Sequence, residues 1–212
     1  MEKSEALLQD NQHKPLTIFS IGHSNQPIEA FLALLQQHQI QVLVDVRSSP
    51  YSKYVSQFNS ATLAVAVQQT GIKYMFMGKE LGGRPDGDEF YDVEGHVLYN
   101  RVAEAPFFLE GINRLKRGGR TYKVAIMCSE EDPTACHRYL LIGRVLAKQG
   151  VDLLHIRGDG HVQTAAELSP SKEIVSAQPS LWGEQLPEQE EGAWKSIRRV
   201  SPKKQPPSSS ER

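Results

Sequence analysis

Short apolar runs recur along the middle of the chain and alternate with stretches of helical periodicity. Five such runs occupy residues 17–21, 42–46, 73–76, 124–127 and 153–156. Because each run is apolar over nearly its whole length, we expect strands that are buried on both faces, as in a parallel sheet.

Four amphipathic helices are predicted between these strands. After Pro27, the side chains of Ile28, Phe31, Leu32 and Leu35 follow the i, i+3, i+4, i+7 spacing of a buried helix face. The other three helical patterns each end at glycine, near residues 71, 118–119 and 150. Strands that alternate with helices imply right-handed crossovers. The predicted fold class is therefore α/β: a three-layer, mostly parallel five-stranded sheet with helices on both faces.

Length and composition predict one domain with disordered ends. A chain of 212 residues with 39% hydrophobic content can bury one substantial core, and no compositional break divides its middle. We expect a single α/β domain over residues 15–168. Residues 1–14 are polar, and residues 169–212 are rich in Pro, Ser, Gln and charge, so both segments are predicted to be disordered.

Charge and hydropathy limit the expected partners. The net charge of −1 gives no general attraction to nucleic acid or to anionic membranes. The first residues lack a signal-peptide pattern, and no stretch approaches the roughly 20 apolar residues of a membrane span. We therefore expect a cytoplasmic protein without a membrane partner. A basic piece of the tail, Lys195 to Lys204, could touch nucleic acid, although a solvated tail is the favoured interpretation.

Polar and charged side chains follow the predicted strands directly. Ligands of open parallel sheets bind outside the carboxyl ends of the strands, where these side chains should converge on one rim. The rim candidates are His23, Ser24, Asp45, Arg47, Lys79, Arg84, Cys128 and Glu130. The glycine-rich residues 82–87 match neither a P-loop nor a dinucleotide-binding fingerprint, and we interpret them as a mobile loop.

Both cysteines of the chain fall in one short block, which continues into His137 and Arg138. We expect a helix to begin near Cys136, with Asp132 as its cap, and its dipole together with the neighbouring cations would lower the pKa of the Cys136 thiol. Burial of Cys128 and Cys136 as small hydrophobic residues fits the pattern equally well.

A metal site is not predicted from this block. The two thiols are eight positions apart, whereas the cysteines of a metal knuckle are about two to four apart. Only tertiary convergence with His137 and His23 could assemble a tetrahedral site. No cofactor can be assigned from the sequence.

Positive charge at the rim predicts an anionic ligand. The rim would be electropositive because it carries Arg47, Lys79, Arg84 and Arg138. Phosphate is the expected ligand of such a site. Alternatives remain for two of the candidates. Asp45 and Arg47, two apart on an extended segment, could instead form a structural pair, and His23 could be a hydrogen-bonded structural residue.

The order of these motifs resembles a known family. Ile21-Gly22-His23-Ser24, Asp45-Val46-Arg47 with Pro50 and Ser52, Leu81-Gly82-Gly83, and the block from Cys128 through Glu130, Pro133 and Cys136 to Arg138 are similar to the signature blocks of domain of unknown function 488. The resemblance covers about residues 17–162. It implies a soluble, mostly bacterial and archaeal α/β domain without an established activity.

Three functions are compatible with the sequence. The leading hypothesis is an enzyme acting on a phosphorylated or nucleotide-like substrate, with Arg47 and Arg138 holding the anion. Glu130 or Asp45 would be the base or nucleophile, His23 an acid or base, and Cys136 or Cys128 an auxiliary or nucleophilic thiol; Ser24, Lys79, Arg84 and His137 complete the predicted binding set. The alternatives are a non-catalytic nucleotide or nucleic-acid binding module, and a thiol redox or metal-binding protein.

Overall fold

A computed structural model describes residues 15–168 and 194–200. It contains a six-stranded sheet in the order β3-β2-β4-β1-β5-β6. The strands are β1 (Thr17–Gly22), β2 (Val42–Asp45), β3 (Lys73–Phe76), β4 (Val124–Cys128), β5 (Asp152–Ile156) and β6 (Val162–Gln163). All neighbouring strands pair in parallel except β5 and β6. The predicted parallel α/β sheet is confirmed.

The predicted strand count of five was one short. The missing strand, β6, has two residues and returns beside β5 after a turn in which the Arg157 amide donates to the His161 carbonyl. A two-residue strand leaves no periodic pattern in the sequence, and only tertiary pairing defines it.

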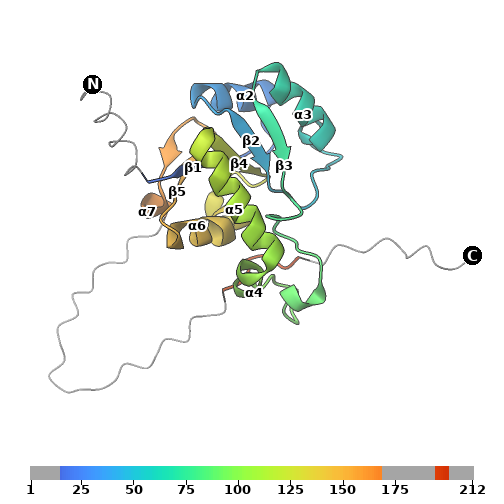
Figure 1. Cartoon of the computed structure of the whole chain (residues 1–212). Coiled ribbons are helices and arrows are strands. Elements are labelled where there is room, and N and C mark those ends of the chain that lie inside the picture. Colours follow the sequence, from blue (N-terminus) through green and yellow to red (C-terminus); the bar gives the residue numbers. More distant parts are fainter. Residues whose placement is uncertain (1–14, 169–193, 201–212) are drawn as a thin grey trace, which may run out of the picture.

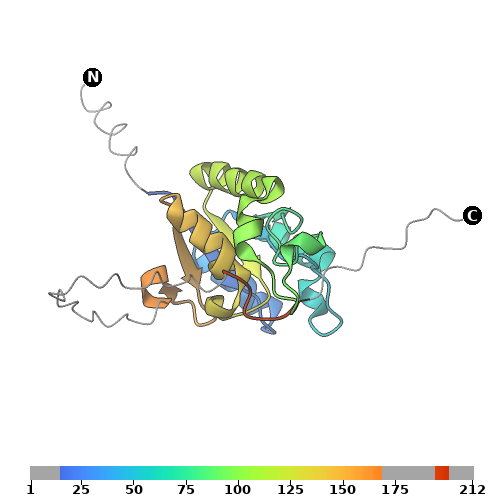
Figure 2. The same ribbon diagram turned by 90° about the horizontal axis from the view of Figure 1, so that it is seen from below.

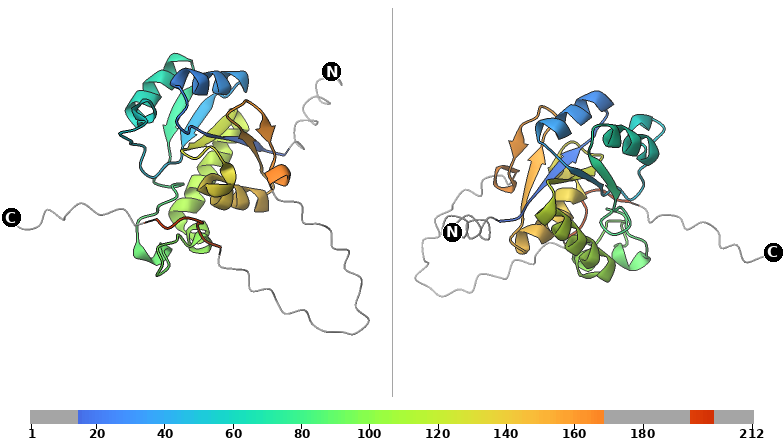
Figure 3. Two further views of the ribbon diagram at one scale, coloured as in Figure 1. Left: turned by 180° about the vertical axis from the view of Figure 1, so that it is seen from behind. Right: turned by 45° about the horizontal axis from the view of Figure 1, so that its top comes forward.

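Helices cover both faces of the sheet (Figures 1 and 3). One face packs against α2 (Ile28–Gln37) and α3 (Ser60–Gln69), and the other against α4 (Tyr99–Glu104), α5 (Pro106–Thr121), the π-helical turn η5 (Arg138–Gly143) and α6 (Arg144–Lys148). Short 3-10 turns occur at η2 (Ser56–Phe58), η3 (Asp88–Phe90) and η4 (Pro133–Ala135), and α7 (Ala165–Leu168) follows β6. Among the described residues, no helix is long and apolar enough to cross a membrane.

Alternation along the strands builds the two cores. In β4, Ala125 and Met127 pack in the α2–α3 core, whereas Ile126 and Cys128 pack in the α5 core. Cys128 therefore faces the layer that contains α4, α5 and η5. The last residue of the central strand is thus brought to the same side of the sheet as Cys136.

One strand departs from the expectation of burial on both faces. β3 alternates between exposed and half-buried residues because it is the edge strand of the sheet, next to β2 alone. Its Lys73 is exposed and its Met75 is 43% exposed. The apolar run predicted the strand correctly, but hydrophobicity alone does not distinguish an edge strand from a central one.

Residues 194–200 pack against the domain, although the sequence placed them within a disordered tail. Leu98 forms an antiparallel bridge with Lys195, the Tyr99 amide donates to the Trp194 carbonyl, and the Ser196 amide donates to the Val97 carbonyl. Figure 2 shows this segment in red. The rest of the predicted tail, 169–193 and 201–212, and the predicted N-terminal segment 1–14 lie outside the described residues.

Candidate functional site

A cavity of about 410 Å³ opens beyond the carboxyl ends of β2 and β4. We call it the rim cavity. It is formed by the loops that follow β2, β3 and β4 and by residues 196–200. Among its lining side chains are Arg47, Arg84, Cys128, Glu130, Cys136 and His137. Predicted rim residues from three strand ends therefore meet in one place.

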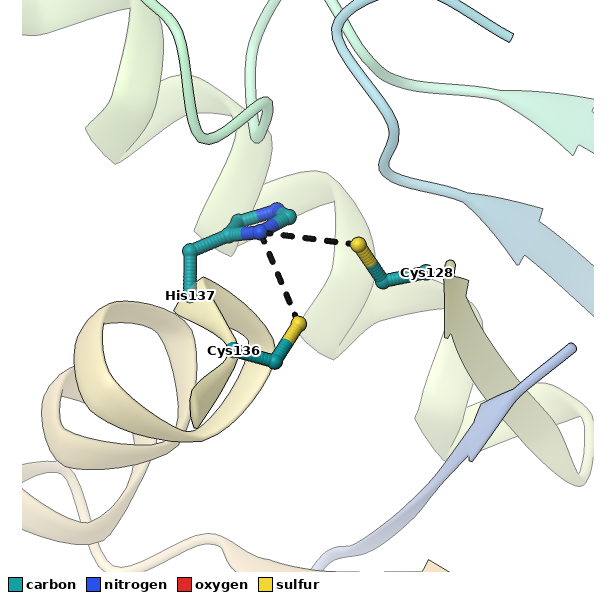
Figure 4. Close-up of side chains that lie close together, drawn as sticks. All are labelled: Cys128, Cys136 and His137. Carbon is teal, nitrogen blue, oxygen red and sulfur yellow. Dashed lines mark hydrogen bonds between the residues drawn. The ribbon is translucent and has the colours of Figure 1, made fainter. Parts of the chain in front are cut away.

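Two thiols and one imidazole form a compact cluster in this cavity (Figure 4). The Nδ1 atom of His137 lies 3.7 Å from the Sγ of Cys128 and 3.8 Å from the Sγ of Cys136. The other ring nitrogen, Nε2, is 3.1 Å from the carbonyl oxygen of Val46. A carbonyl oxygen can only accept, so Nε2 carries a proton and Nδ1 is the atom that faces both sulfurs.

The environment makes the two thiols unequal. Burial opposes ionisation of Cys136, but its polar contact with the Cys128 side chain and the positive charge of His137 outweigh burial and lower the pKa of Cys136 to about 5. The pKa of Cys128 is raised by its interaction with Cys136 and by burial. At neutral pH, Cys136 is therefore the thiolate, and Cys128 remains a thiol.

His137 and Glu130 carry the matching charges. Burial disfavours a charged imidazole, yet the Cys136 thiolate raises the pKa of His137. Burial likewise opposes ionisation of Glu130, but a hydrogen bond from Cys128, whose Sγ is 3.1 Å from Oε2, lowers the pKa of this carboxyl. The cluster thus combines a thiolate, an imidazolium and a carboxylate.

The loop after β4 is held close to β1. The His23 amide donates to the Cys128 carbonyl over 3.0 Å, and the Ser24 amide donates to the Ser129 carbonyl over 2.8 Å. A side chain at Gly22 would drive its Cβ into the Glu130 carbonyl oxygen, so only glycine permits this approach. The loop that presents Cys128 and Glu130 is therefore fixed by backbone contacts.

The local structure around Cys136 differs from the predicted helix start. Asp132 does cap a turn, accepting from the Thr134 amide over 2.9 Å, but the turn is the three-residue 3-10 helix η4. Cys136 then adopts an extended conformation, with φ −121° and ψ 142°, and η5 begins only after His137. The helix dipole argument placed Cys136 too far into the helix; His137 and Cys128 account for its low pKa instead.

A glycine in the loop after β3 lets His137 fit under that loop. A Cβ atom on Gly83 would lie 2.8 Å from Cγ and 2.9 Å from Nδ1 of the His137 ring. The same loop is tied to the loop after β2, because the Arg84 amide donates to Ser48 Oγ over 2.8 Å. The predicted mobile glycine-rich loop thus packs directly against the thiol–imidazole cluster.

Asp45, Arg47 and His23 form a separate buried chain. Arg47 binds both oxygens of Asp45, with Nε 2.9 Å from Oδ1 and NH2 2.6 Å from Oδ2, and its NH1 is 3.0 Å from Nε2 of His23. Tyr74 donates its hydroxyl to Oδ2 of Asp45 over 2.7 Å. The carboxylate of Asp45 is thereby fully engaged, which is the structural pair that the sequence left open.

His23 is neutral in this arrangement. Burial, followed by the charge of Arg47, lowers the pKa of His23 to about 4. Its ring stacks on Phe58 with centroids 4.2 Å apart, and its Nδ1 lies 2.7 Å from the Ser24 carbonyl oxygen. Both ring nitrogens are occupied, and neither His23 nor Asp45 lines the rim cavity. Their predicted catalytic roles have no support in this geometry.

The predicted anion-binding residues divide into two groups. Arg47, Arg84 and His137 line the rim cavity. Ser24 and Lys79 do not line it, and Lys79 is exposed. Arg138 is fully buried and donates its NH1 and NH2 groups to the carbonyls of Glu130 and Glu131. These contacts hold the loop, and Arg138 does not line the rim cavity; its role in substrate binding stays a prediction.

Several cavity residues were not selected as site residues from the sequence. Tyr99 is 3% exposed and lines the cavity, and burial raises the pKa of its hydroxyl, which stays protonated. Arg198 and Arg199 line the cavity from the C-terminal segment. A signal for that segment exists in the sequence, because Trp194 precedes the basic residues, and an aromatic residue is uncommon in a solvated tail.

Two groups of side chains could hold a metal ion among the described residues. Cys128, Cys136 and His137 have their ligand atoms within 4.8 Å of one another, a convergence that the spacing in the sequence did not favour. The second group comprises Asp92, Glu94 and His96, whose acidic members also pair with Lys195.

Similarity to known proteins shows the family of this chain. A crystal structure from Shewanella putrefaciens CN-32, described as "Putative phosphatase (DUF442)", is 15% identical over 78% of each chain, with a TM-score of 0.37. A likeness at this level carries no argument. Among curated proteins, none matches the chain. A family model described as "Domain of unknown function DUF488" matches residues 27–145, more than half of the chain, so this protein belongs to that family.

Proposed function

We propose that this protein is an enzyme that hydrolyses a phosphate ester, with the Cys136 thiolate as its nucleophile. The observation that carries the proposal is the position of Cys136. Its sulfur lines a cavity of about 410 Å³, beside the imidazolium of His137 and facing a lining that includes four arginines. A nucleophile with a depressed pKa next to an anion-binding lining is a typical arrangement for covalent catalysis on an anionic substrate.

The first step forms a covalent intermediate. The Cys136 Sγ donates an electron pair to phosphorus, the S–P bond forms, and the P–O bond to the leaving group breaks. The leaving alcohol takes a proton from water in the cavity. Arg84 has no ion-pair partner within the described residues. Its guanidinium neutralises charge on the phosphoryl oxygens while the phosphoryl group passes through the transition state.

The second step restores the enzyme. A water molecule attacks phosphorus, and the Glu130 carboxylate accepts its proton. The S–P bond breaks, its electrons return to Cys136 as the thiolate, and inorganic phosphate leaves with the oxygen of the water. Glu130 then passes its proton to the hydroxide that remained when water protonated the leaving alcohol, which restores the carboxylate. Glu130 suits this task because its lowered pKa keeps it ionised, and it lines the same cavity as Cys136.

Turnover measured on a panel of phosphate monoesters tests the proposal. Cys136→Ser should lose at least about a thousandfold in kcat, because the hydroxyl has no depressed pKa. Cys128→Ser should retain a thiolate at Cys136 and most of the activity. Acid quenching during turnover should trap a phosphate adduct on Cys136, detected by mass spectrometry. Full activity of Cys136→Ser would refute the nucleophile, and ligand binding without turnover would favour a binding module.

A metal site is the second candidate function that the geometry favours. The Cys128, Cys136 and His137 ligand atoms lie within 4.8 Å of one another, and the outer nitrogen of His137 donates to the Val46 carbonyl, as metal-bound imidazoles usually do. Metal analysis of the purified protein separates the candidates. Stoichiometric zinc that is lost in Cys128→Ser and in Cys136→Ser would assign the cluster to metal binding.

A further inference from the structure

The C-terminal segment 194–200 is anchored to the domain by contacts of several kinds. Nε1 of Trp194 donates to the Leu140 carbonyl over 2.8 Å, and the guanidinium carbon of Arg144 lies 4.7 Å from the Trp194 ring centroid. Lys195 binds Asp92 over 2.9 Å. The Val200 amide donates to the Gly95 carbonyl over 2.7 Å, which ties the far end.

These anchors direct the middle of the segment at the rim cavity. Ser196 is buried, receives the Val97 amide on its hydroxyl and donates that hydroxyl to the Arg198 carbonyl. This tight turn brings Arg198 and Arg199 to the cavity wall, where both line it. The Trp194 ring also meets Tyr99 edge-on, at 6.2 Å between centroids, so the anchor touches a cavity residue as well.

The charges of this wall have no partner inside the described parts of the chain. No ion pair involves Arg84, Arg198 or Arg199 there, whereas Arg47 is paired with Asp45. Across the lining, four guanidinium groups stand against the single carboxylate of Glu130. Subtracting the pair formed with Asp45 leaves three unpaired guanidinium groups. With the carboxylate of Glu130 counted, an excess of two positive charges remains in the lining. The unpaired guanidinium groups come from separate segments, Arg84 from the loop after β3 and Arg198 and Arg199 from the C-terminal segment.

The size of the cavity also exceeds a single phosphate. A volume of about 410 Å³ falls in the range of pockets that hold whole small molecules. A phosphate group has five heavy atoms and fills a minor part of it. The arginines of the lining come from two places: Arg47 and Arg84 from the loops after β2 and β3, and Arg198 and Arg199 from the C-terminal segment. Cys136 comes from a third element, the loop after β4.

We propose that Arg198 and Arg199 form a second anion subsite, so that the ligand of this cavity is a small molecule with at least two linked phosphate groups. One phosphate faces Cys136 and Arg84, and the second is bound by the C-terminal segment. The proposal rests on the proposed function for the identity of the first position. It adds the substrate class and gives a segment outside the α/β sheet a direct role in binding.

Calorimetric titration of the full chain tests the subsite with two probes, inorganic pyrophosphate and inorganic phosphate. Wild-type protein should bind pyrophosphate at least tenfold more tightly than phosphate. Replacing Arg198→Gln and Arg199→Gln together should weaken pyrophosphate at least tenfold and phosphate less than threefold. The matched control replaces Arg117→Gln and Arg120→Gln, which removes the same charge from exposed positions on α5 outside the cavity. It should bind pyrophosphate like wild type.

A variant of the anchor tests whether binding depends on the position of residues 194–200 as well as on the charge of their arginines. Trp194→Ala keeps both arginines but removes the contacts to Leu140 and Arg144, and it should weaken pyrophosphate about as much as the double arginine variant. The arginine variants alter exposed side chains and keep the test open if Trp194→Ala unfolds the protein.

Several results would overturn the subsite. These are pyrophosphate binding that the double arginine variant leaves unchanged, an equal loss in the α5 control, and a wild-type protein that binds neither probe. Tight, salt-dependent binding of single-stranded oligonucleotides that the double variant abolishes would also overturn it, because the segment would then be a nucleic-acid contact. Loss of pyrophosphate binding in the double arginine variant reports on the subsite alone, whereas turnover by Cys136→Ser reports on the nucleophile alone, so failure of the nucleophile and failure of the subsite are distinguishable.

Discussion

The Nδ1 atom of His137 lies 3.8 Å from the sulfur of Cys136, the residue before it in the chain. Adjacent side chains usually diverge. Here they converge because Cys136 is extended, with ψ 142°, whereas His137 already has the helical values φ −59° and ψ −22°. The change of backbone conformation between the two residues directs both side chains towards the end of β4. The thiol of Cys128 lies there, next to the His137 ring (Figure 4).

Alkylation should reveal this pairing. The rate of Cys136 alkylation by iodoacetamide should rise with pH around a midpoint near pH 5, while Cys128 should stay unreactive at neutral pH because its pKa is raised. His137→Asn removes the neighbouring positive charge and should move the midpoint towards the ordinary thiol value of about 8.5. Peptide mass spectrometry assigns the modified cysteine. His161→Asn, at an exposed histidine, is the control, and an unchanged midpoint in His137→Asn would contradict the pairing.

Gly83→Ala should disturb the cluster from the opposite side. The added Cβ would lie 2.8 Å from the His137 ring, so the ring or the loop after β3 must shift, at a cost of about 1–3 kcal/mol in the free energy of unfolding. We expect Cys136 alkylation at pH 6 to slow by about tenfold as its cation moves. In Gly118→Ala, inside α5, the Cβ would meet nothing closer than 4.0 Å, so reactivity should stay near wild type and stability should rise by about 0.5–1 kcal/mol because alanine favours the helix. Equal behaviour of the two variants would show that the loop does not position His137.

Sequence patterns predicted the layers of this fold but not the contacts within its site. Apolar runs and two of the three glycine stops identify strands and helices because burial and left-handed helix ends are local requirements: Gly71 and Gly150 have φ of +81° and +70° at the ends of their helices. The third predicted stop was wrong, because α5 continues through Gly118 and Gly119 to Thr121. Convergence at the carboxyl rim followed from parallel topology, and it brought Arg47, Glu130, Cys136 and His137 to one cavity.

The direction of each side chain was beyond such reasoning. Arg138 and Arg47 both come from predicted rim segments, yet one donates to loop carbonyls and the other to Asp45. A guanidinium takes whichever acceptors the folded chain places around it, and those acceptors come from residues distant in sequence. The packing of residues 194–200 was missed for the same reason, because its partners lie near residues 92–99 and 140.

Asp45→Asn should destabilise the fold strongly. The substitution leaves Arg47, which is 7% exposed, as a buried cation without its carboxylate, and the loss of one partner of a buried ion pair costs about 3–5 kcal/mol. Urea unfolding measures the change. Glu80→Gln breaks the partly exposed pair with Arg114 and should cost at most about 1 kcal/mol. A loss at Asp45 no larger than at Glu80 would mean that the buried chain from Asp45 to His23 does not support the core.

Stability should fall as the pH is lowered from 7.5 to 5, in part because of His155. Burial, then the charges of Arg138 and Arg157, lowers the pKa of His155 to about 3. The unfolded chain binds a proton near pH 6.5 while the folded protein does not, so acid favours unfolding, and His155 contributes about 2 kcal/mol of lost stability at pH 5. Urea unfolding at both pH values should therefore show a fall about 2 kcal/mol smaller in His155→Gln than in wild type, whatever the variant's absolute stability. The control is His161→Gln, at an exposed position. It should show the same fall in the free energy of unfolding between pH 7.5 and pH 5 as wild type. If His155→Gln also shows the wild-type difference, His155 accepts a proton in the folded state, which its complete burial and the charges of Arg138 and Arg157 oppose.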